Sequence, residues 1–243
     1  MIYDILKCKV ILKKDIYFRD AFSKIAHYVY WTLSQNDKFR EFHKEKYIKH
    51  YVISNFYKPE IDKIYKKDKI YHFEIRSIDR GLINYLQNNL KKNINNPDFL
   101  VIDTEFRYKK QKFIKEIISL TPTIITLPNG RFWTMKESGD IILLQKQLTI
   151  NLLKKYALDK YKEYECDNFI EMIEILNHKP QTITIKNNIK LFGNLFKIVP
   201  KSDSFSQNLA FYALGVGLGE KNTYGGGFCR SIEIKENGNL QNK

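Results

Sequence analysis

The stretch that decides the fold of this chain reads Ala213-Leu-Gly-Val-Gly-Leu-Gly-Glu-Lys-Asn-Thr-Tyr-Gly-Gly-Gly-Phe-Cys-Arg230. Six of the 11 glycines lie within 13 residues here, from Gly215 to Gly227. Glycine adopts backbone angles that other residues avoid and allows close approach of other atoms, but ordering it loses more conformational entropy. So dense a cluster predicts a loop whose backbone lies against something.

This loop follows a predicted helix at 204–217, which Ser202, Asp203 or Ser204 can cap, and precedes a strand at 228–234. Nucleotide-binding glycine loops precede their helices, so this is not one of them. A glycine C-cap with a loose turn explains one or two glycines. Six favour a loop that contacts a ligand, and on a basic chain that ligand is a phosphate.

The second half of the chain predicts further elements upstream of this helix. Short strands are expected at 119–134, a long helix at 138–160, and strands near 168–177, 180–186 and 189–199. The first half predicts a strand at 2–12, a helix at 18–35, strands at 47–57 and 70–78, a helix at 79–93, a strand at 98–108 and a further candidate strand at 112–118.

Both halves therefore follow the order β-α-β-β-α-β, which is that of ferredoxin-like domains and of RNA-recognition modules. The predicted fold class is α+β, with two tandem ferredoxin-like domains at 1–118 and 119–243 and a C-terminal glycine-rich loop. The repeat is one of element order and not of sequence.

Composition indicates the class of partner. The chain has 41 Lys and Arg against 27 Asp and Glu, a formal net charge of +14. This excess favours a polyanion, nucleic acid first and a membrane surface second. A hydrophobic fraction of 43% supports packed cores, and 16 Tyr and 16 Phe include candidate stacking platforms for bases.

Cysteine usage and hydropathy limit the cellular settings in which we expect this protein. Cys8, Cys166 and Cys229 are far apart and form no CxxC or Cys/His cluster, so neither a disulfide framework nor a zinc site is expected. The N-terminus lacks an apolar signal core, and no apolar run approaches a membrane span. These features predict a soluble, cytoplasmic protein with no metal and no cofactor.

Five histidines are candidates for proton transfer: His27, His43, His50, His72 and His178. Most histidines are structural or merely exposed. His43 stands out because it lies among lysines in a polar segment between a helix and a strand, where site residues often lie. His27 lies off the apolar stripe of the first helix, as do Tyr28 and Trp31, and it is a rival together with His50.

The C-terminal loop resembles that of the CRISPR repeat-processing endoribonucleases of the repeat-associated mysterious protein (RAMP) superfamily. The shared features are Gly217-Leu-Gly-Glu-Lys221 and a second glycine group, although the usual final glycine is Cys229 here. Family members often carry a histidine before a strand, as His43 precedes Lys49-His-Tyr-Val-Ile-Ser54. Tyr28 and Lys49 match two further places of the family pattern.

The resemblance implies a metal-independent endoribonuclease that cleaves precursor CRISPR RNA within the repeat. The 2′-hydroxyl would attack, leaving a 2′,3′-cyclic phosphate and a 5′-hydroxyl. His43 would act as general acid or base, Lys49 would stabilise charge and Tyr28 would orient the hydroxyl. The residues expected to bind RNA are Gly215, Gly217, Gly219, Lys221, Gly225, Gly226, Gly227 and Arg230.

Two other functions stay open. One is a non-catalytic repeat or guide-RNA-binding subunit of a CRISPR effector complex, and the other is a basic ferredoxin-like regulator of nucleic acid. The expected partner is CRISPR repeat RNA, with effector-complex subunits as further candidates. The protein is expected to be a monomer or homodimer that does not bind membranes.

Overall fold

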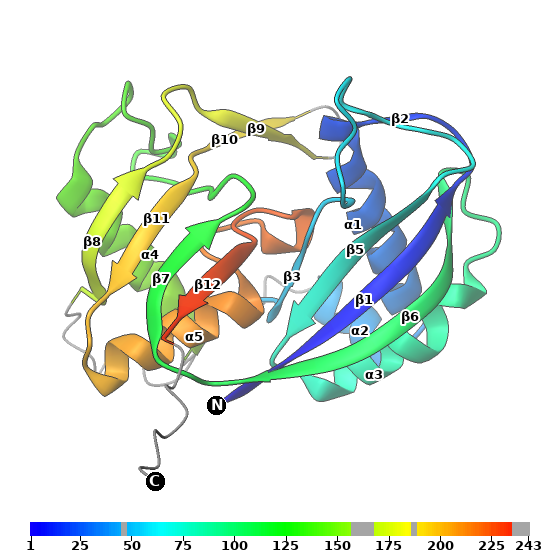
Figure 1. Cartoon of the computed structure of the whole chain (residues 1–243), viewed down its shortest axis with the longest axis horizontal. Coiled ribbons are helices and arrows are strands. Elements are labelled where there is room, and N and C mark those ends of the chain that lie inside the picture. The colour runs from blue at the N-terminus through cyan, green and yellow to red at the C-terminus, as the bar shows by residue number, and fades with distance from the viewer. Residues whose placement is uncertain (45–47, 157–167, 186–188, 235–243) are drawn as a thin grey trace, which may run out of the picture.

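The computed structural model describes residues 1–44, 48–156, 168–185 and 189–234, except for the side chains of 42–44. This part of the chain forms two four-stranded antiparallel sheets side by side, with helices packed behind each (Figure 1). The sheet faces that carry no helix point toward the viewer.

The first sheet has the order β3-β5-β1-β6. Its strands are β1 (Ile2–Leu12), β3 (Tyr51–Ile53), β5 (Ile70–Ser77) and β6 (Phe99–Lys110). Helices α1 (Phe18–Ser34) and α3 (Arg80–Asn89) cover one face. Alternation along β1 explains the layering, since Leu6, Cys8 and Val10 are fully buried in the core while Lys7 and Lys9 are only partly buried.

Smaller elements complete this half. They are β2 (Ile16–Tyr17), which pairs with β4 (Ile64–Tyr65), helix α2 (Asp37–Lys44) and the 3₁₀ turn η1 (Leu90–Lys92). Helix α1 buries Phe22, Ile25, Val29 and Leu33, the apolar stripe that its sequence predicts.

The second sheet has the order β12-β7-β11-β8. Its strands are β7 (Ile114–Ser119), β8 (Ile170–Ile175), β11 (Phe196–Pro200) and β12 (Cys229–Glu233). Helices α4 (Ile141–Tyr156) and α5 (Ser204–Val216) pack on it. A hairpin of β9 (Gln181–Thr184) and β10 (Lys190–Gly193) is inserted between β8 and β11, and a 3₁₀ turn, η4 (Asn222–Tyr224), lies in the glycine loop.

In both halves the fourth strand lies beside the first, the first beside the third, and the third beside the second. This is the ferredoxin-like arrangement, so the predicted tandem fold is confirmed. Two predicted strands differ, however. Of the strand expected at 180–186, Gln181–Thr184 pairs with Lys190–Gly193 in the inserted hairpin. Of the strand expected at 189–199, only the part from Phe196 onward enters the main sheet, because Gly193 and Asn194 separate the two stretches.

The junction between the halves precedes the predicted boundary after residue 118. Strand β7 pairs with β11 and β12 and so belongs wholly to the second sheet. The turn between Lys110 and Ile114 is therefore the link, and the candidate strand at 112–118 opens the second domain. The periodicity of β7 alone does not tell which sheet it joins.

Helix α5 joins the two halves. The side chain of Asp203 caps it by accepting a hydrogen bond from the Ser206 amide at 2.9 Å, as one of the three predicted caps. The helix contacts β1, β3 and β5 of the first domain as well as β7, β11 and β12 of its own. The rings of Tyr3 and Phe211 lie 5.1 Å apart across this contact, so the domains share apolar packing.

Within the described ranges, no helix combines the length and apolar character needed to cross a membrane. Cys8 and Cys229 are buried free thiols, and Cys166 lies outside the described residues.

Candidate active site

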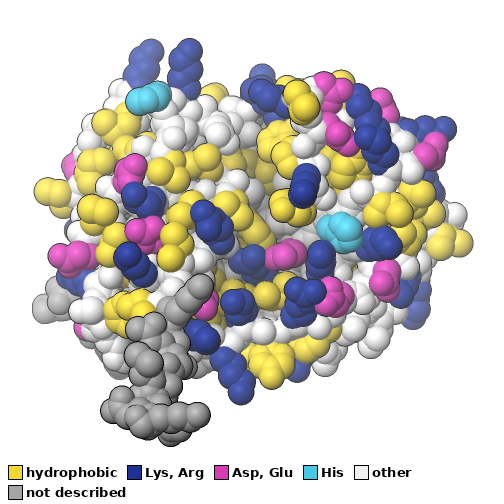
Figure 2. Space-filling model, in the orientation of Figure 1, with side chains coloured by type: hydrophobic (Ala, Val, Ile, Leu, Met, Phe, Trp, Pro, Cys, Tyr) yellow, Lys and Arg dark blue, Asp and Glu magenta, His cyan; other side chains and the backbone are white. Residues whose placement is uncertain are grey.

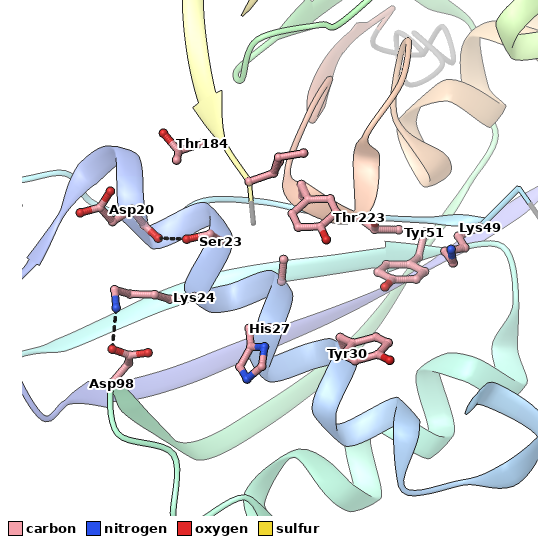
Figure 3. Close-up of a pocket in the computed structure, with 13 residues that line it drawn as sticks. Asp20, Ser23, Lys24, His27, Tyr30, Lys49, Tyr51, Asp98, Thr184 and Thr223 are labelled. Atoms are coloured by element: carbon pink, nitrogen blue, oxygen red, sulfur yellow. Dashed lines mark hydrogen bonds and ion pairs between the residues drawn. The ribbon is translucent and has the colours of Figure 1, made fainter. Parts of the chain in front are cut away.

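A cleft of about 660 Å³ opens between helix α1 and the turn η4 in the middle of the glycine loop (Figure 3). Helix α1 forms one wall of the cleft. Asp98 and the chain around the start of β3 extend that wall, and the end of β9 and η4 form the opposite side. Both halves of the chain therefore contribute. The lining residues are Asp20, Ser23, Lys24, Ala26, His27, Tyr30, Lys49, Tyr51, Asp98, Thr184, Ile185, Thr223 and Tyr224.

Helical spacing explains the α1 wall. Its polar members fall at positions 20, 23, 24, 27 and 30, which share one helix face. Both His27 and Tyr30 are exposed, and Figure 3 shows them on successive turns beside the cleft. An accessible imidazole is thus held on a rigid helix.

One of the two acidic residues that line the cleft, Asp98, has its charge offset by lysines. One carboxylate oxygen of Asp98 lies 2.7 Å from the Nζ atoms of both Lys14 and Lys24. Burial raises the pKa of Asp98, but the two ammoniums outweigh it and lower that pKa overall. Asp98 is therefore ionised near neutral pH and offset by two lysines, so it opposes a polyanion only weakly.

Lys49 lines the other end of the cleft, and Lys221 lies near it. Lys49 is half-buried just before β3, and Lys221 is exposed on the glycine loop. Burial lowers the pKa of Lys49, and the positive charge of Lys221 lowers it further. Neighbouring ammoniums that repel one another gain from binding an anion between them, so this end suits a phosphate.

Tyr28 does not fit the role that the family pattern assigns to it. It is fully buried, stacks on Phe99 with 4.6 Å between ring centroids, and its hydroxyl donates to the Leu90 carbonyl at 2.9 Å. Burial raises the pKa of Tyr28 to about 12. Helix α1 is covered by η1 as well as by the sheet, so the buried face is wider than the apolar stripe predicts.

The histidines are dispersed. His43 lies in α2, and its side chain falls outside the described residues. His50 precedes β3 and points to Tyr212, with 6.4 Å between ring centroids, and its buried Nε2 atom has no hydrogen-bond partner among the residues that the structure describes. His72 lines a second cleft of about 400 Å³ on the open face of the first sheet, and His178 is exposed beyond β8.

The glycines of the loop contact the protein itself. All six are buried. A Cβ atom at Gly227 would lie 1.9 Å from the Leu218 carbonyl oxygen, at Gly219 2.4 Å from that of Ile124, and at Gly225 2.4 Å from the Phe22 ring. That Gly215, Gly217, Gly219, Gly225, Gly226 and Gly227 bind RNA stays a prediction, and their burial does not favour it. Close internal packing accounts for them.

The two charged residues predicted for RNA binding lie apart. Lys221 lies near Lys49, which lines the cleft, whereas exposed Arg230 lies on the open face of the second sheet, in a row with Ile118 and Lys197. Figure 2 shows this open face, where lysine and arginine side chains cross both sheets with some acidic neighbours. The basic surface is thus larger than the cleft.

Sequence reasoning ranked His27 as a rival and passed over Tyr30, Thr184 and Thr223. The position of His27 off the apolar stripe was the available signal. Nothing in the local sequence indicated that the β9 end would reach α1, because that contact joins an insertion of one domain to a helix of the other. In the described part of the chain, no three His, Cys, Asp or Glu side chains gather as a metal site would require.

No protein-family model matches the chain, and no curated protein matches it by sequence. Among solved structures, a CRISPR-associated protein Cas6 is similar with a TM-score of 0.67 and 20% identity, covering 95% of this chain and 100% of that one. A Cas6-related protein from Pyrococcus furiosus has a TM-score of 0.68 and 20% identity, covering 94% and 98%.

A RAMP protein that binds different RNA substrates has a TM-score of 0.70 and 17% identity, covering 95% of this chain and 100% of that one. Similarity at such identities concerns the fold and not the activity. The chain therefore has the tandem ferredoxin-like fold of the Cas6 and RAMP proteins.

Proposed function

We propose that this protein is an endoribonuclease that cleaves precursor CRISPR RNA within the repeat, with the cleft on α1 as its active site. The observation that carries this proposal is the exposed His27 imidazole in the same cleft as Lys49, next to Lys221. The fold shared with Cas6 and with an RNA-binding RAMP protein supports RNA as the substrate, as does a net charge of +14.

RNA carries its own nucleophile for this reaction. The 2′-oxygen forms a bond to the adjacent phosphorus, and the bond from phosphorus to the 5′-oxygen of the next nucleotide breaks. A base takes the proton of the 2′-hydroxyl, and an acid gives a proton to the leaving oxygen. The products are a 2′,3′-cyclic phosphate and a 5′-hydroxyl, and this route requires no metal ion.

Side chains of the cleft suit these steps. An imidazole titrates at about pH 6.5 in the absence of perturbation and can serve as base or acid near neutrality. His27 takes that role, while Lys49 and Lys221 stabilise the charge that develops on the phosphate oxygens. Tyr30 orients the substrate. His43 remains the second candidate histidine, because it lies on α2, which contacts α1.

The test is cleavage of a labelled RNA that carries one CRISPR repeat, in excess EDTA. We expect a 2′,3′-cyclic phosphate product, and no cleavage when the nucleotide before the cut has a 2′-deoxy sugar. Binding of the deoxy RNA should stay within a few-fold of that of the intact RNA. Activity that depends on added magnesium, or normal cleavage of the deoxy substrate, would contradict the mechanism.

Burial of Tyr28 favours a second candidate, a non-cleaving RNA-binding subunit of an effector complex. One of the three side chains expected in the site is part of the core, and the RAMP protein of similar fold is described by its RNA binding. Tight binding of the repeat RNA without any cleavage would favour this candidate. Light scattering of the free protein and of its RNA complex would separate a monomer from a homodimer.

A further inference from the structure

We propose that Lys155 is a positioning residue, whose buried ammonium clamps the glycine loop so that Lys221, Thr223 and Tyr224 face the cleft. Lys155 lies in the last turn of α4 and is the only lysine buried among the residues that the structure describes, with 5% of its surface exposed. The consequence for RNA rests on the proposed function, whereas the clamp itself does not.

The geometry fits a charged amine. Nζ of Lys155 donates to the Gly217 carbonyl at 2.9 Å, to Oδ1 of Asn222 at 2.7 Å, and to the Gly219 carbonyl. Lysine has three N–H donors only when it is protonated, and here three oxygens accept them. An unpaired buried charge is costly, so the loop that supplies these oxygens is held in the conformation that satisfies it.

Asn222 extends the clamp across the loop. Its Nδ2 atom donates to the Leu218 carbonyl at 2.9 Å and to the Gly226 carbonyl at 2.8 Å. The ammonium and this amide thus tie the first glycine group to the second. The turn between the two groups carries Lys221, Thr223 and Tyr224, and the last two line the cleft. Fixing the loop therefore fixes one wall of the site.

The charge on this clamp depends on pH. The groups that face Lys155 are Glu220 on the loop, Cys229 on β12, His50 before β3 and Tyr212 on α5. Burial lowers the pKa of Lys155 to about 7, although Cys229 and Glu220 partly oppose this. Below that pH the ammonium offers three donors to three acceptors. Above it, a neutral amine offers two, so one loop oxygen loses its partner, but the cost of burying the charge is removed. Because the pKa is lowered, the second effect is the larger, and raising the pH favours the closed loop.

The experiment is amide hydrogen exchange of the loop, residues 217–227, in wild type and in Lys155→Met. Methionine has a side chain of similar length but lacks the amine. Lys154→Met is the matched control, since Lys154 is exposed on the same helix turn. We expect at least a tenfold loss of loop protection in Lys155→Met, little change in Lys154→Met, and unchanged protection in β1 and β5. Loop protection equal to wild type, or a loss spread over both domains, would overturn the clamp.

Wild type alone gives a second readout that a purely packing role would not produce. After correction for intrinsic exchange rates, its loop protection should rise severalfold between pH 6 and pH 8.5, because the opened loop binds the Lys155 proton more tightly than the closed loop does, while that of Lys155→Met stays flat. Equal protection at both pH values in wild type would overturn the ammonium clamp. Repeat-RNA affinity measured in parallel distinguishes the two proposals. A loosened loop with unchanged affinity would count against Lys221 in the proposed function and leave the clamp standing.

Discussion

Tyr28 and Tyr30 lie two positions apart on α1 and have different surroundings. Tyr30 is 38% exposed beside the cleft, while Tyr28 is fully buried against Phe99 and Leu90. Periodicity finds the face of α1 that meets the sheet, but it does not reveal that η1 covers a second face. For that reason the sequence identifies the helix correctly and assigns the wrong tyrosine to its exposed side.

At the residue scale, we predict that His27→Ala slows single-turnover cleavage of the repeat RNA by about 10²–10⁴-fold, the usual size of a general acid–base contribution. Affinity for the RNA should change little, because an exposed imidazole contributes little binding. His43→Ala and His50→Ala are measured beside it. If His43→Ala is the crippling change and His27→Ala is not, the catalytic histidine lies on α2.

Tyr28→Phe is the control for this series. It removes the donor to the Leu90 carbonyl, which should lower stability by about 1 kcal/mol and Tm by a few degrees. Cleavage by the folded enzyme should match wild type. A large loss of cleavage rate without a change in Tm would indicate that Tyr28 acts in the active site after all.

At the scale of elements, the glycine loop shows what a dense cluster of glycines in a sequence can and cannot indicate. A cluster of glycines does predict close backbone approach, and four of these six have positive φ. The identity of the approaching group is set by tertiary packing, which places Pro122, Ile124 and other backbone of the loop itself against the glycines. The loop, the helix before it and the strand after it were predictable, while its internal partner was not.

We predict that Gly227→Ala destabilises the protein by at least about 2 kcal/mol, because its Cβ would clash with a backbone carbonyl at a φ of 64°. Gly130→Ala is the matched control. Gly130 has a φ of 80°, yet nothing lies within 4 Å of a Cβ there, so only backbone strain of about 1 kcal/mol applies. Thermal melts of both variants measure the difference. Equal losses of stability in the two variants would show that backbone strain, and not the clash with the carbonyl, explains why glycine is needed at position 227.

At the scale of the whole molecule, Arg76 joins the two sheets. It lies on the open face of β5, and its Nη1 atom donates to the Cys229 carbonyl at 2.6 Å, across the domain boundary. The guanidinium also lies 4.1 Å from the centroid of the Phe228 ring and pairs with Glu74 at 2.8 Å. One side chain thus connects the first sheet to the residues that end the glycine loop.

Arg76→Met should therefore weaken the junction between the domains. Loss of the hydrogen bond leaves the Cys229 carbonyl without this donor and Glu74 without its cation, which together should cost about 1–3 kcal/mol. Arg107→Met is the control, because Arg107 lies in the same row of the sheet but pairs with Glu105 at the exposed edge. Exposed pairs contribute at most about 1 kcal/mol. Melting curves, with hydrogen exchange of 228–233 beside them, separate the two variants. Equal losses would mean that Arg76 adds nothing to the domain contact, and that the other contacts, those of α5 and of α1 with β9 among them, hold the sheets in the arrangement that forms the cleft.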